Sequence, residues 1–296
     1  MSIAGYILSP VIGLVVGIFF MGLFRVIMAR IHWRYGPPLT QPVIDIIKLF
    51  HQKSFSHGVI FELGLILSLA GSVVTLLFIP IGTICPLNVA GGLLVVLYLM
   101  LLAPIGIALS GGGGSNPNIS IGISRKMLLA LSYEVPFLLV VLTVMIHYKT
   151  ISLVSLVELQ RASGWGIISL PLTGIAYFLI LPAMLGIRPF DMVEAPQEIA
   201  SGLKVEYSGK FLVVYYIEHA LRRFIVIALF VNLLLGGAGE PFTFLVKMLV
   251  VFVICVCINA VFPRFRMEQA IRFNWTWPTM LALAGLVIAC IWGGYG

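Results

Sequence analysis

Long uncharged stretches divide this chain into segments of the length that crosses a membrane. Residues 63–124 contain no Asp, Glu, Lys or Arg, and residues 1–24 are likewise uncharged. About 20 apolar residues in a helix span a hydrocarbon core roughly 30 Å thick. We therefore expect an all-α integral membrane protein in which residues 1–296 form a single membrane domain. The pattern predicts eight transmembrane helices, at about residues 3–28, 59–80, 89–110, 127–147, 166–186, 211–235, 243–262 and 274–293.

Two polar connections, residues 29–58 and 187–210, are larger than the others. In the first, Pro42 is expected to open a short helix with Asp45 and Lys48 on its polar side. An amphipathic helix of this kind suits the membrane interface or the underside of a partner protein, and the pattern favours neither. Its apolar face would comprise Val43, Ile46, Ile47 and Phe50.

The basic residues between the predicted spans are distributed very unequally. Only Lys149 and Arg161 fall in the loops after spans 2, 4 and 6. Because Lys and Arg are enriched in cytoplasmic loops, the opposite side is predicted to be cytoplasmic and both termini to lie outside. The predicted cytoplasmic loops contain Arg30, Arg34, Lys48, Lys53, Arg125, Lys126, Arg188, Lys204, Lys210, Arg264, Arg266 and Arg272.

Composition supports the membrane assignment and excludes several other classes. Hydrophobic residues make up 60% of the chain and charged residues 10%, against roughly 25% charged in a soluble domain. The net charge of +7 is spread over short loops, so it does not indicate nucleic-acid binding. The four cysteines have no spacing typical of an iron–sulfur site, and the histidines have no metal-ligand spacing. We expect no cofactor or metal in this chain.

Glu134 lies in the middle of the fourth predicted span. A carboxylate at that depth is expected to face the interior of the helix bundle and to be protonated or partnered. Intramembrane carboxylates usually mark ion or proton pathways, although a neutral Glu hydrogen-bonded to a neighbouring helix is the structural alternative.

Asp191, Glu194 and Glu198 follow i, i+3, i+7 spacing, so on a helix they would share one face. Pro189 and Pro196 divide this region, which favours a broken helix over a straight one. Three carboxylates on one face repel, so we expect at least one raised pKa. A proton path and a docking site for a basic partner are both compatible with this acidic segment.

Glu218 and Arg222 lie in the first half of the sixth predicted span with the i, i+4 order that favours a same-face ion pair. His219 is a candidate proton relay, although a lone membrane histidine is more often hydrogen-bonded structure. Nothing along the chain resembles a hydrolytic triad or a nucleotide-binding motif. These residues indicate ion movement, or coupling of another process to ion movement.

Four segments resemble the membrane H subunit of complex I and its hydrogenase relatives. Residues 35–50 read Tyr-Gly-Pro-Pro-Leu-Thr-Gln-Pro-Val-Ile-Asp-Ile-Ile-Lys-Leu-Phe and are similar to the first cytoplasmic loop of that family. The segments Ser-Tyr-Glu at 132–134, Pro-Phe-Asp-Met-Val-Glu-Ala-Pro-Gln-Glu at 189–198 and Glu-Tyr-Ser-Gly at 206–209 match it in the same order. The resemblance covers nearly the whole chain.

The first loop distinguishes two branches of this superfamily. The quinone-reducing branch has a longer loop with a Gly-Pro-Asn-Arg-Val-Gly-Pro motif, which residues 34–42 lack. The compact form is similar to subunits of energy-converting, membrane-bound [NiFe] hydrogenases, such as the formate hydrogenlyase and archaeal ferredoxin-linked types. A related archaeal sulfur-reducing complex shares this architecture, and the sequence does not separate the two.

The resemblance implies a multi-pass cell-membrane subunit that links ferredoxin-driven H2 evolution to proton or sodium translocation. Residues 29–58 and 187–210 would form the docking surface for the peripheral arm, with Arg34, Asp45 and Lys48 in it. Its partners would be hydrogenase large and small subunits, an iron–sulfur subunit and antiporter-like membrane subunits. The [NiFe] centre and [4Fe-4S] clusters would lie in those partners. Glu134, Asp191, Glu194, Glu198, Glu206, Glu218 and Arg222 would line the ion path.

Alternatives to the hydrogenase role stay open. Within the family, the chain is compatible with a quinone-linked or sulfur-reducing complex. A stand-alone ion-coupled transporter would also need intramembrane carboxylates, although we see no internal repeat of the kind that many transporters have. The remaining interpretation is a purely structural anchor without an ion path. The ion itself, the electron donor and the direction of H2 chemistry are not specified by the sequence.

Overall fold

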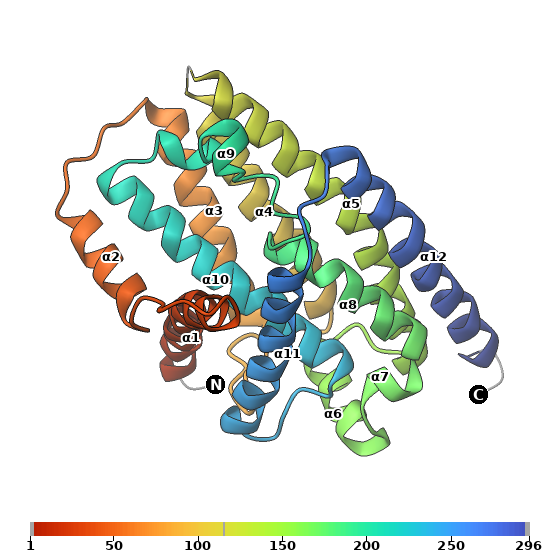
Figure 1. The fold of residues 1–296 in the computed structure, drawn as a ribbon. Helices are drawn as coiled ribbons and strands as arrows, with labels where there is room; N and C mark the ends of the chain where they lie inside the picture. The colour runs from red at the N-terminus through yellow and green to blue at the C-terminus, as the bar shows by residue number, and fades with distance from the viewer. Residues whose placement is uncertain (1–2, 115, 294–296) are drawn as a thin grey trace.

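A computed structural model describes residues 3–114 and 116–293, and within these ranges it contains helices and no β-strand (Figure 1). An isolated bridge joins Ile81 and Ile84 in the connection after α3. The helices are α1 (Ile3–Ile31), α2 (Gln41–Phe50), α3 (Val59–Phe78), α4 (Gly92–Gly112), α5 (Pro117–Tyr148), α6 (Leu153–Ser163), α7 (Gly166–Ser169), α8 (Pro171–Leu185), α9 (Pro196–Ile199), the 3-10 helix η1 (Gly202–Val205), α10 (Gly209–Leu234), α11 (Pro241–Val261) and α12 (Met267–Gly293).

Each predicted span coincides with helical structure, and the all-α class is confirmed for the described residues. Among the described residues, six helices are long and apolar enough to cross a membrane: α1, α3, α4, α5, α11 and α12. The fifth predicted span corresponds to α7 and α8, and α8 has 15 residues. The sixth corresponds to α10, which has 26 residues and carries Glu218, Arg222 and Arg223. The count of eight spans and the side of the termini therefore stay predictions.

Small residues allow α3 and α4 to pack closely along their lengths. A Cβ atom added at Gly64 would lie 2.6 Å from the Gly106 oxygen, and one at Gly106 would lie 2.6 Å from the Gly64 oxygen. Small residues at such positions let backbones approach, which is how membrane helices gain packing energy without a hydrophobic driving force.

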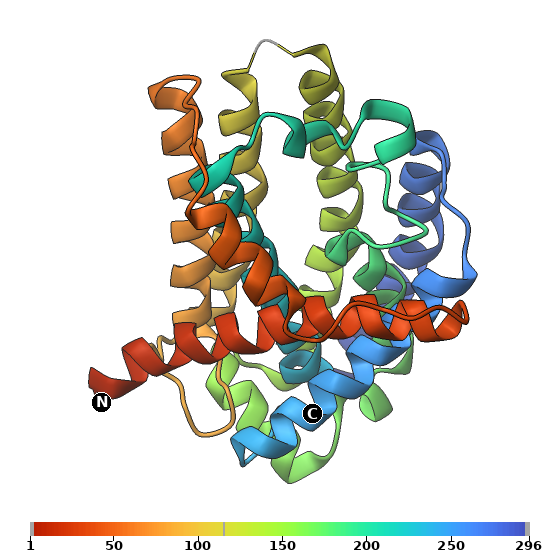
Figure 2. The ribbon, with the colours of Figure 1, turned by 60° about the vertical axis from the view of Figure 1, so that its left-hand side comes forward.

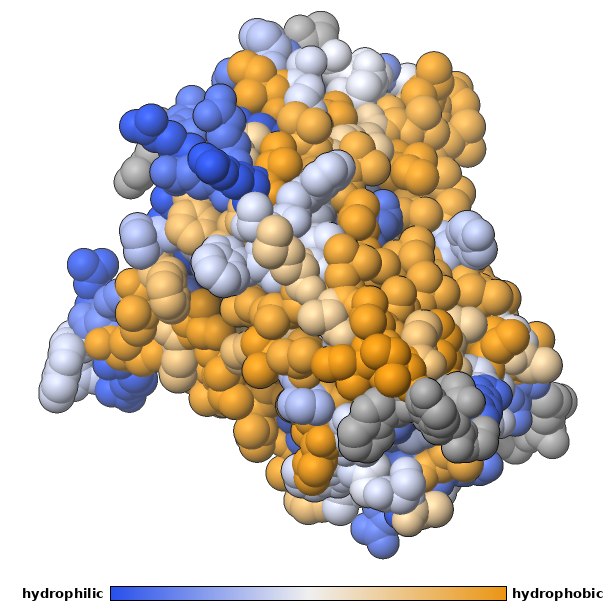
Figure 3. Space-filling view, turned by 90° about the vertical axis from the view of Figure 1, so that its right-hand side faces the viewer, coloured by the Kyte–Doolittle hydropathy of each residue, from blue (hydrophilic) through white to orange (hydrophobic). Residues whose placement is uncertain are grey.

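The centre of the molecule is α10, whose second half is almost completely buried. It packs against α1, α3 and α8, while α12 covers α5 and α8 on another side. Figure 2 shows α1 crossing the molecule at a large angle to α3 and α5. A broad apolar surface covers the side that Figure 3 displays, as expected for a face exposed to lipid or to neighbouring membrane subunits. This arrangement places the charged first half of α10 in the interior.

Helix α2 forms as predicted, but its orientation adds information that the pattern lacked. Asp45 accepts a hydrogen bond from Arg25 of α1 over 2.9 Å, so this residue of the polar side is turned toward the protein, whereas Lys48 is exposed. Val43, Ile47 and Phe50 are exposed. Most of the apolar face therefore points outward, whereas Ile46 of the same face is half-buried.

One helix of the structure and the position of three carboxylates differ from what the sequence predicts. Helix α6 lies in a connection where no helix was predicted. Residues 186–195 are not helical, and the first helix of that connection, α9, has only 4 residues. The preference for a broken helix is thus confirmed, whereas the shared helical face of Asp191, Glu194 and Glu198 is wrong because these residues lie in turns and in a single helical turn.

Candidate functional site

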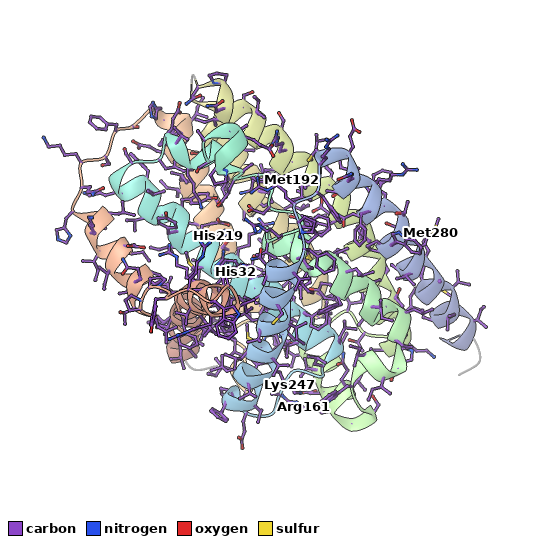
Figure 4. All side chains as sticks on the ribbon, in the orientation of Figure 1. His32, Arg161, Met192, His219, Lys247 and Met280 are labelled. Carbon is purple, nitrogen blue, oxygen red and sulfur yellow. The ribbon has the colours of Figure 1, made fainter. Side chains whose placement is uncertain are left out.

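A small cavity of about 70 Å³ lies where α5, α8, α10 and the connection 186–208 meet. Figure 4 shows two landmarks of this region, His219 of α10 and Met192 of the connection, well inside the outline of the molecule. The walls of the cavity contain carboxylates, cations and phenols. The polar and charged lining residues are Lys126, Tyr133, Asp191, Glu194, Tyr215, Glu218, His219, Arg222 and Arg223.

Glu218 is the most deeply buried carboxylate in this cavity, with 1% of the residue exposed. Neither of its carboxylate oxygens has a hydrogen-bond partner among the described residues. Lys126 and Arg222 are the cations that act on it electrostatically, but no cation nitrogen of the described chain lies within 4.0 Å. The predicted Glu218–Arg222 ion pair is therefore wrong, because Arg222 is directed to another acceptor.

That acceptor is Tyr133 of α5. Arg222 Nη2 donates to the Tyr133 hydroxyl over 2.7 Å, and Arg222 Nη1 is buried with no partner in the described chain. Tyr133 and Arg222, together with Met184, also line a second cavity of about 210 Å³ between α4, α5 and α10. Glu134 lies in the wall of this second cavity. The Tyr133–Arg222 pair thus forms a shared wall, with Glu218 on one side and Glu134 on the other.

Three carboxylates of the connection 186–208, namely Asp191, Glu194 and Glu198, are each matched with a cation. Arg264 Nη2 donates to Asp191 over 3.1 Å, and Arg125 Nη1 donates to Glu198 over 2.7 Å. Glu198 also lies 3.8 Å from Arg264 Nη1, and 51% of its side chain is exposed. Glu198 does not line the cavity and marks the outer end of this group of carboxylates, whereas Asp191 also lines the cavity.

Glu194 connects the outer end with the cavity. Lys204 Nζ and the Tyr215 hydroxyl both donate to its carboxylate, the latter over 2.9 Å. Tyr215 belongs to α10, one turn before Glu218. A carboxylate of the loop therefore contacts the same helix that carries the buried one.

Burial and charge act oppositely on the pKa values of Asp191 and Glu194. Burial raises the pKa of Asp191 above its ordinary value, and the neighbouring Arg264 only partly offsets this effect. Burial also raises the pKa of Glu194, but Lys204 and the hydrogen bond from Tyr215 outweigh it, so the net pKa is lowered. The expectation of at least one raised pKa in the acidic segment is met by Asp191.

Glu206 lies apart from this cluster. Its carboxylate is 4.0 Å from His57 Nε2, and its Oε2 atom is buried without a hydrogen-bond partner in the described chain. A Cβ atom at Gly114 would collide with that carboxylate. Glu206 thus joins the ends of the two large connections near the turn after α4.

The three predicted docking residues differ in their surroundings. Arg34 and Lys48 are exposed, as docking requires. Asp45 is held by Arg25 and by Gln41 Nε2 at 2.8 Å, so it positions α2. The docking role itself stays a prediction.

Several residues of the site were not singled out in the sequence. Tyr133 was visible as the neighbour of Glu134, and Lys126 as a cation at the start of a span, but neither position alone specifies a contact. Tyr215 and Lys204 become significant only when the connection 186–208 folds onto α10. Among the residues that the structure describes, no group of three His, Cys, Asp or Glu side chains is arranged to hold a metal ion.

Comparison with known proteins identifies the family of this chain. The NADH dehydrogenase family model matches residues 4–290. The H subunit of the NADH-quinone oxidoreductase of Protochlamydia amoebophila (strain UWE25) is 30% identical over 293 residues, covering 90% of this chain and 89% of the relative. The corresponding protein of Dehalococcoides mccartyi (strain CBDB1) is 31% identical over 288 residues, covering 91% of this chain and 80% of the relative.

A solved structure is also similar over almost the entire chain. It is that of a membrane-bound sulfane sulfur reductase, an archaeal respiratory membrane complex. One of its chains shares 38% identity with a TM-score of 0.92, covering 96% of this chain and 98% of its own length. The helical architecture, the apolar spans and these matches agree, and the chain belongs to the NADH dehydrogenase family of multi-pass membrane proteins, the family of complex I subunit 1.

Proposed function

We propose that this chain is the membrane anchor and coupling subunit of a respiratory oxidoreductase complex. In this role it links redox chemistry in a peripheral arm to translocation of protons or sodium ions. The observation that carries the proposal is the succession of ionisable groups from the connection 186–208 to Glu134, through two cavities that share Tyr133 and Arg222.

The chemistry of the interior supports ion transfer over a purely structural role. A buried carboxylate without a partner is costly, and packing alone gives no reason to keep one. Glu218 is such a group, and Lys126, Tyr215 and His219 line the same cavity. Protons reaching this cavity would find groups that gain and lose protons on each side of the Tyr133–Arg222 wall.

The two large connections support the anchoring role. They meet through the hydrogen bond from the Phe55 N–H to the Ser208 hydroxyl, at 2.9 Å. Next to this contact, α2 presents its outward apolar face and the exposed Lys48. We propose that this surface carries a peripheral redox arm whose subunits hold the electron-transfer centres.

Three identities for that arm are supported by different observations. The compact first loop resembles that of [NiFe] hydrogenases, whose arm would hold the [NiFe] centre and [4Fe-4S] clusters. The 38% identity to the sulfane sulfur reductase chain favours a sulfur-reducing complex. A quinone-linked arm is supported by the relatives at 30% and 31% identity.

Purification of the tagged chain from its native host in mild detergent tests the assignment. Hydrogenase-type large and small subunits with bound nickel would establish the hydrogenase identity. The same type of arm without nickel would establish the sulfur-reducing identity if it reduces sulfur, and the quinone-linked identity if it reduces quinone. A chain that emerges alone, under conditions that retain other membrane complexes, would contradict the proposed role.

A further inference from the structure

A third pocket, into which two cations are directed, lies at the end of the molecule opposite the connection 186–208. It has a volume of about 400 Å³ and is formed by α6, the connection around Trp165, the loop 235–240 and the first turns of α11. Figure 4 shows Arg161 and Lys247 together at this end, beyond His219 and far from Met192. None of the ion-path residues lines it.

Two cations converge on this pocket. Lys247 Nζ donates to the Leu235 oxygen over 2.7 Å and to the Gly237 oxygen over 2.6 Å, and Arg161 Nη2 donates to the Ala238 oxygen. Gly236 and Gly237 have positive φ angles of 69° and 52°, which suit glycine and let the loop turn its carbonyls toward the cations. The loop orients both side chains.

The positive charge of this pair is not neutralised by the described chain. No carboxylate oxygen of the described residues lies within 4.0 Å of either cation. Lys has three donors and Arg five, so the three loop carbonyls leave donors of both side chains unused. Phosphate oxygens are strong acceptors for such donors, and Arg in particular binds them with two parallel hydrogen bonds.

Gln160 provides an independent observation. It is 1% exposed, lines the pocket, and donates from Nε2 to the Leu233 oxygen over 2.7 Å. Its Oε1 atom is buried with no hydrogen-bond partner in the described residues. A buried acceptor without a partner is costly, and fully ionised phosphate has no donor to offer it. A hydroxyl-bearing ligand would satisfy the Oε1 atom once the Gln160 side chain turns that buried atom toward the pocket.

The surroundings place the pocket at a membrane surface. Trp165 is 49% exposed with Lys247 Nζ 5.1 Å from its ring, and Phe242 at the start of α11 is 73% exposed. Tryptophan is enriched where the hydrocarbon core meets the headgroups. A ligand bound here would have its polar part in the pocket and apolar chains beside α11.

We propose that this pocket binds the headgroup of an anionic phospholipid, with the phosphate at Arg161 and Lys247 and a headgroup hydroxyl at Gln160. The pocket therefore selects a phosphate-bearing polyol lipid over a zwitterionic one. This inference concerns lipid binding on the face opposite the docking loops, and it is independent of the proposed coupling role.

Native mass spectrometry of the purified full-length chain tests the site. The chain would be equilibrated in detergent with phosphatidylglycerol, with phosphatidylcholine, or with inorganic phosphate alone. We expect one phosphatidylglycerol per chain to be retained in preference to phosphatidylcholine. Arg161→Gln and Lys247→Gln should each weaken this retention about tenfold, because each removes a charge-assisted contact.

Lys149→Gln provides the matched control, since Lys149 is predicted to be on the same side but does not line the pocket. Arg161→Lys, which keeps the charge, should retain more lipid than Arg161→Gln. Equal retention in all variants would overturn the proposal, as would equal binding of the two lipids. Binding of inorganic phosphate with no preference between the lipids would overturn the lipid assignment. Quenching of Trp165 fluorescence by a headgroup-labelled lipid, measured against Trp165→Phe, locates the bound lipid without relying on stability.

Discussion

The acidic residues of the connection 186–208 and those of the helical interior differ in whether another side chain neutralises them. In the connection, Asp191, Glu194 and Glu198 each contact a cation side chain from another segment or from a later part of the same one. In the interior, Glu218 has no hydrogen-bond partner in the described chain, and Glu134 faces a cavity. The less accessible group is thus the less neutralised one.

This difference distinguishes charges that stabilise the fold through ion pairs from charges whose protonation can change. A direct ion pair fixes two segments relative to each other, and breaking it destabilises the fold where the pair outweighs the cost of burying its charges. A carboxylate held near cations but not bound to them can change its protonation or hydration with little rearrangement. We therefore expect substitutions of the interior residues to change ion movement most. Substitutions in the connection should change the stability of the fold, or change neither stability nor ion movement by much.

The largest effect is expected for Glu218→Gln. Glutamine keeps the shape and removes a buried carboxylate that has no direct partner in the described chain, so the chain should still assemble. Redox-driven ion uptake by membrane vesicles should fall by about tenfold or more, in the range that loss of a positioned proton-transfer group produces. Glu158→Gln, which changes an exposed acidic residue of α6, is the control. Normal ion uptake in Glu218→Gln would remove this residue from the path.

Tyr133→Phe should have the next largest effect. The change leaves Arg222 Nη2 without its acceptor, beside an Nη1 atom that already has none in the described chain. We expect a loss of about 1–3 kcal/mol in stability and slower ion uptake, because the wall between the two cavities loses its fixed geometry. Thermal unfolding in detergent and vesicle uptake measure the two effects. A variant with unchanged uptake would show that this wall has no part in ion transfer.

Glu194→Gln should reveal a pH-dependent contribution to stability. The pKa of Glu194 is lowered from 4.5, so its ionised form stabilises the fold above that pH, and the stabilisation is lost as the pH falls through the lowered pKa. The variant should be less stable than the original protein at neutral pH, and the difference should shrink below about pH 4.

Asp191→Asn is the matched comparison, because the pKa of Asp191 is raised whereas that of Glu194 is lowered. The pKa of Asp191 is raised by burial, so ionisation disfavours the folded state and protonation favours it. At neutral pH this variant should be as stable as the original protein or more stable. If both variants gave the same pH profile, the distinction between the two carboxylates would be wrong. Unfolding temperatures across a pH series provide the measurement.

The smallest effect on stability is expected for Glu198→Gln. Its pairs with Arg125 and Arg264 are close, but 51% of the side chain is exposed. Exposed ion pairs contribute within about 1 kcal/mol, so the unfolding temperature should hardly change. A large destabilisation would mean that a partner or the fold buries this pair more deeply than the isolated chain does.

Much of the fold could be predicted from the sequence because the length of an apolar segment is a local property of the chain. The spans at 59–80 and 243–262 match α3 and α11 within a few residues. The short helix opened near Pro42 also formed, because a proline in its first turn and an amphipathic pattern are both local signals. Helix α6 escaped detection because its sequence mixes apolar and polar residues without a long uncharged stretch.

The contacts of the site were less accessible, for two physical reasons. Spacing predicts a shared face only where a helix exists, and Pro189 and Pro196 prevent one across residues 186–198. The i, i+4 order of Glu218 and Arg222 predicts an ion pair only if no better acceptor is near. Tyr133, 89 positions earlier in the chain, is such an acceptor.

The sequence by itself determined that this is a helical membrane protein, where most of its spans lie, and which ionisable residues are candidates for function. Those properties follow from composition and from periodicity over neighbouring residues. Only the tertiary structure decided which carboxylates are paired, that Tyr133 and Arg222 separate two cavities, and that Arg161 and Lys247 share a pocket. Each of these depends on helices distant in sequence packing at particular angles and depths, which local patterns do not encode.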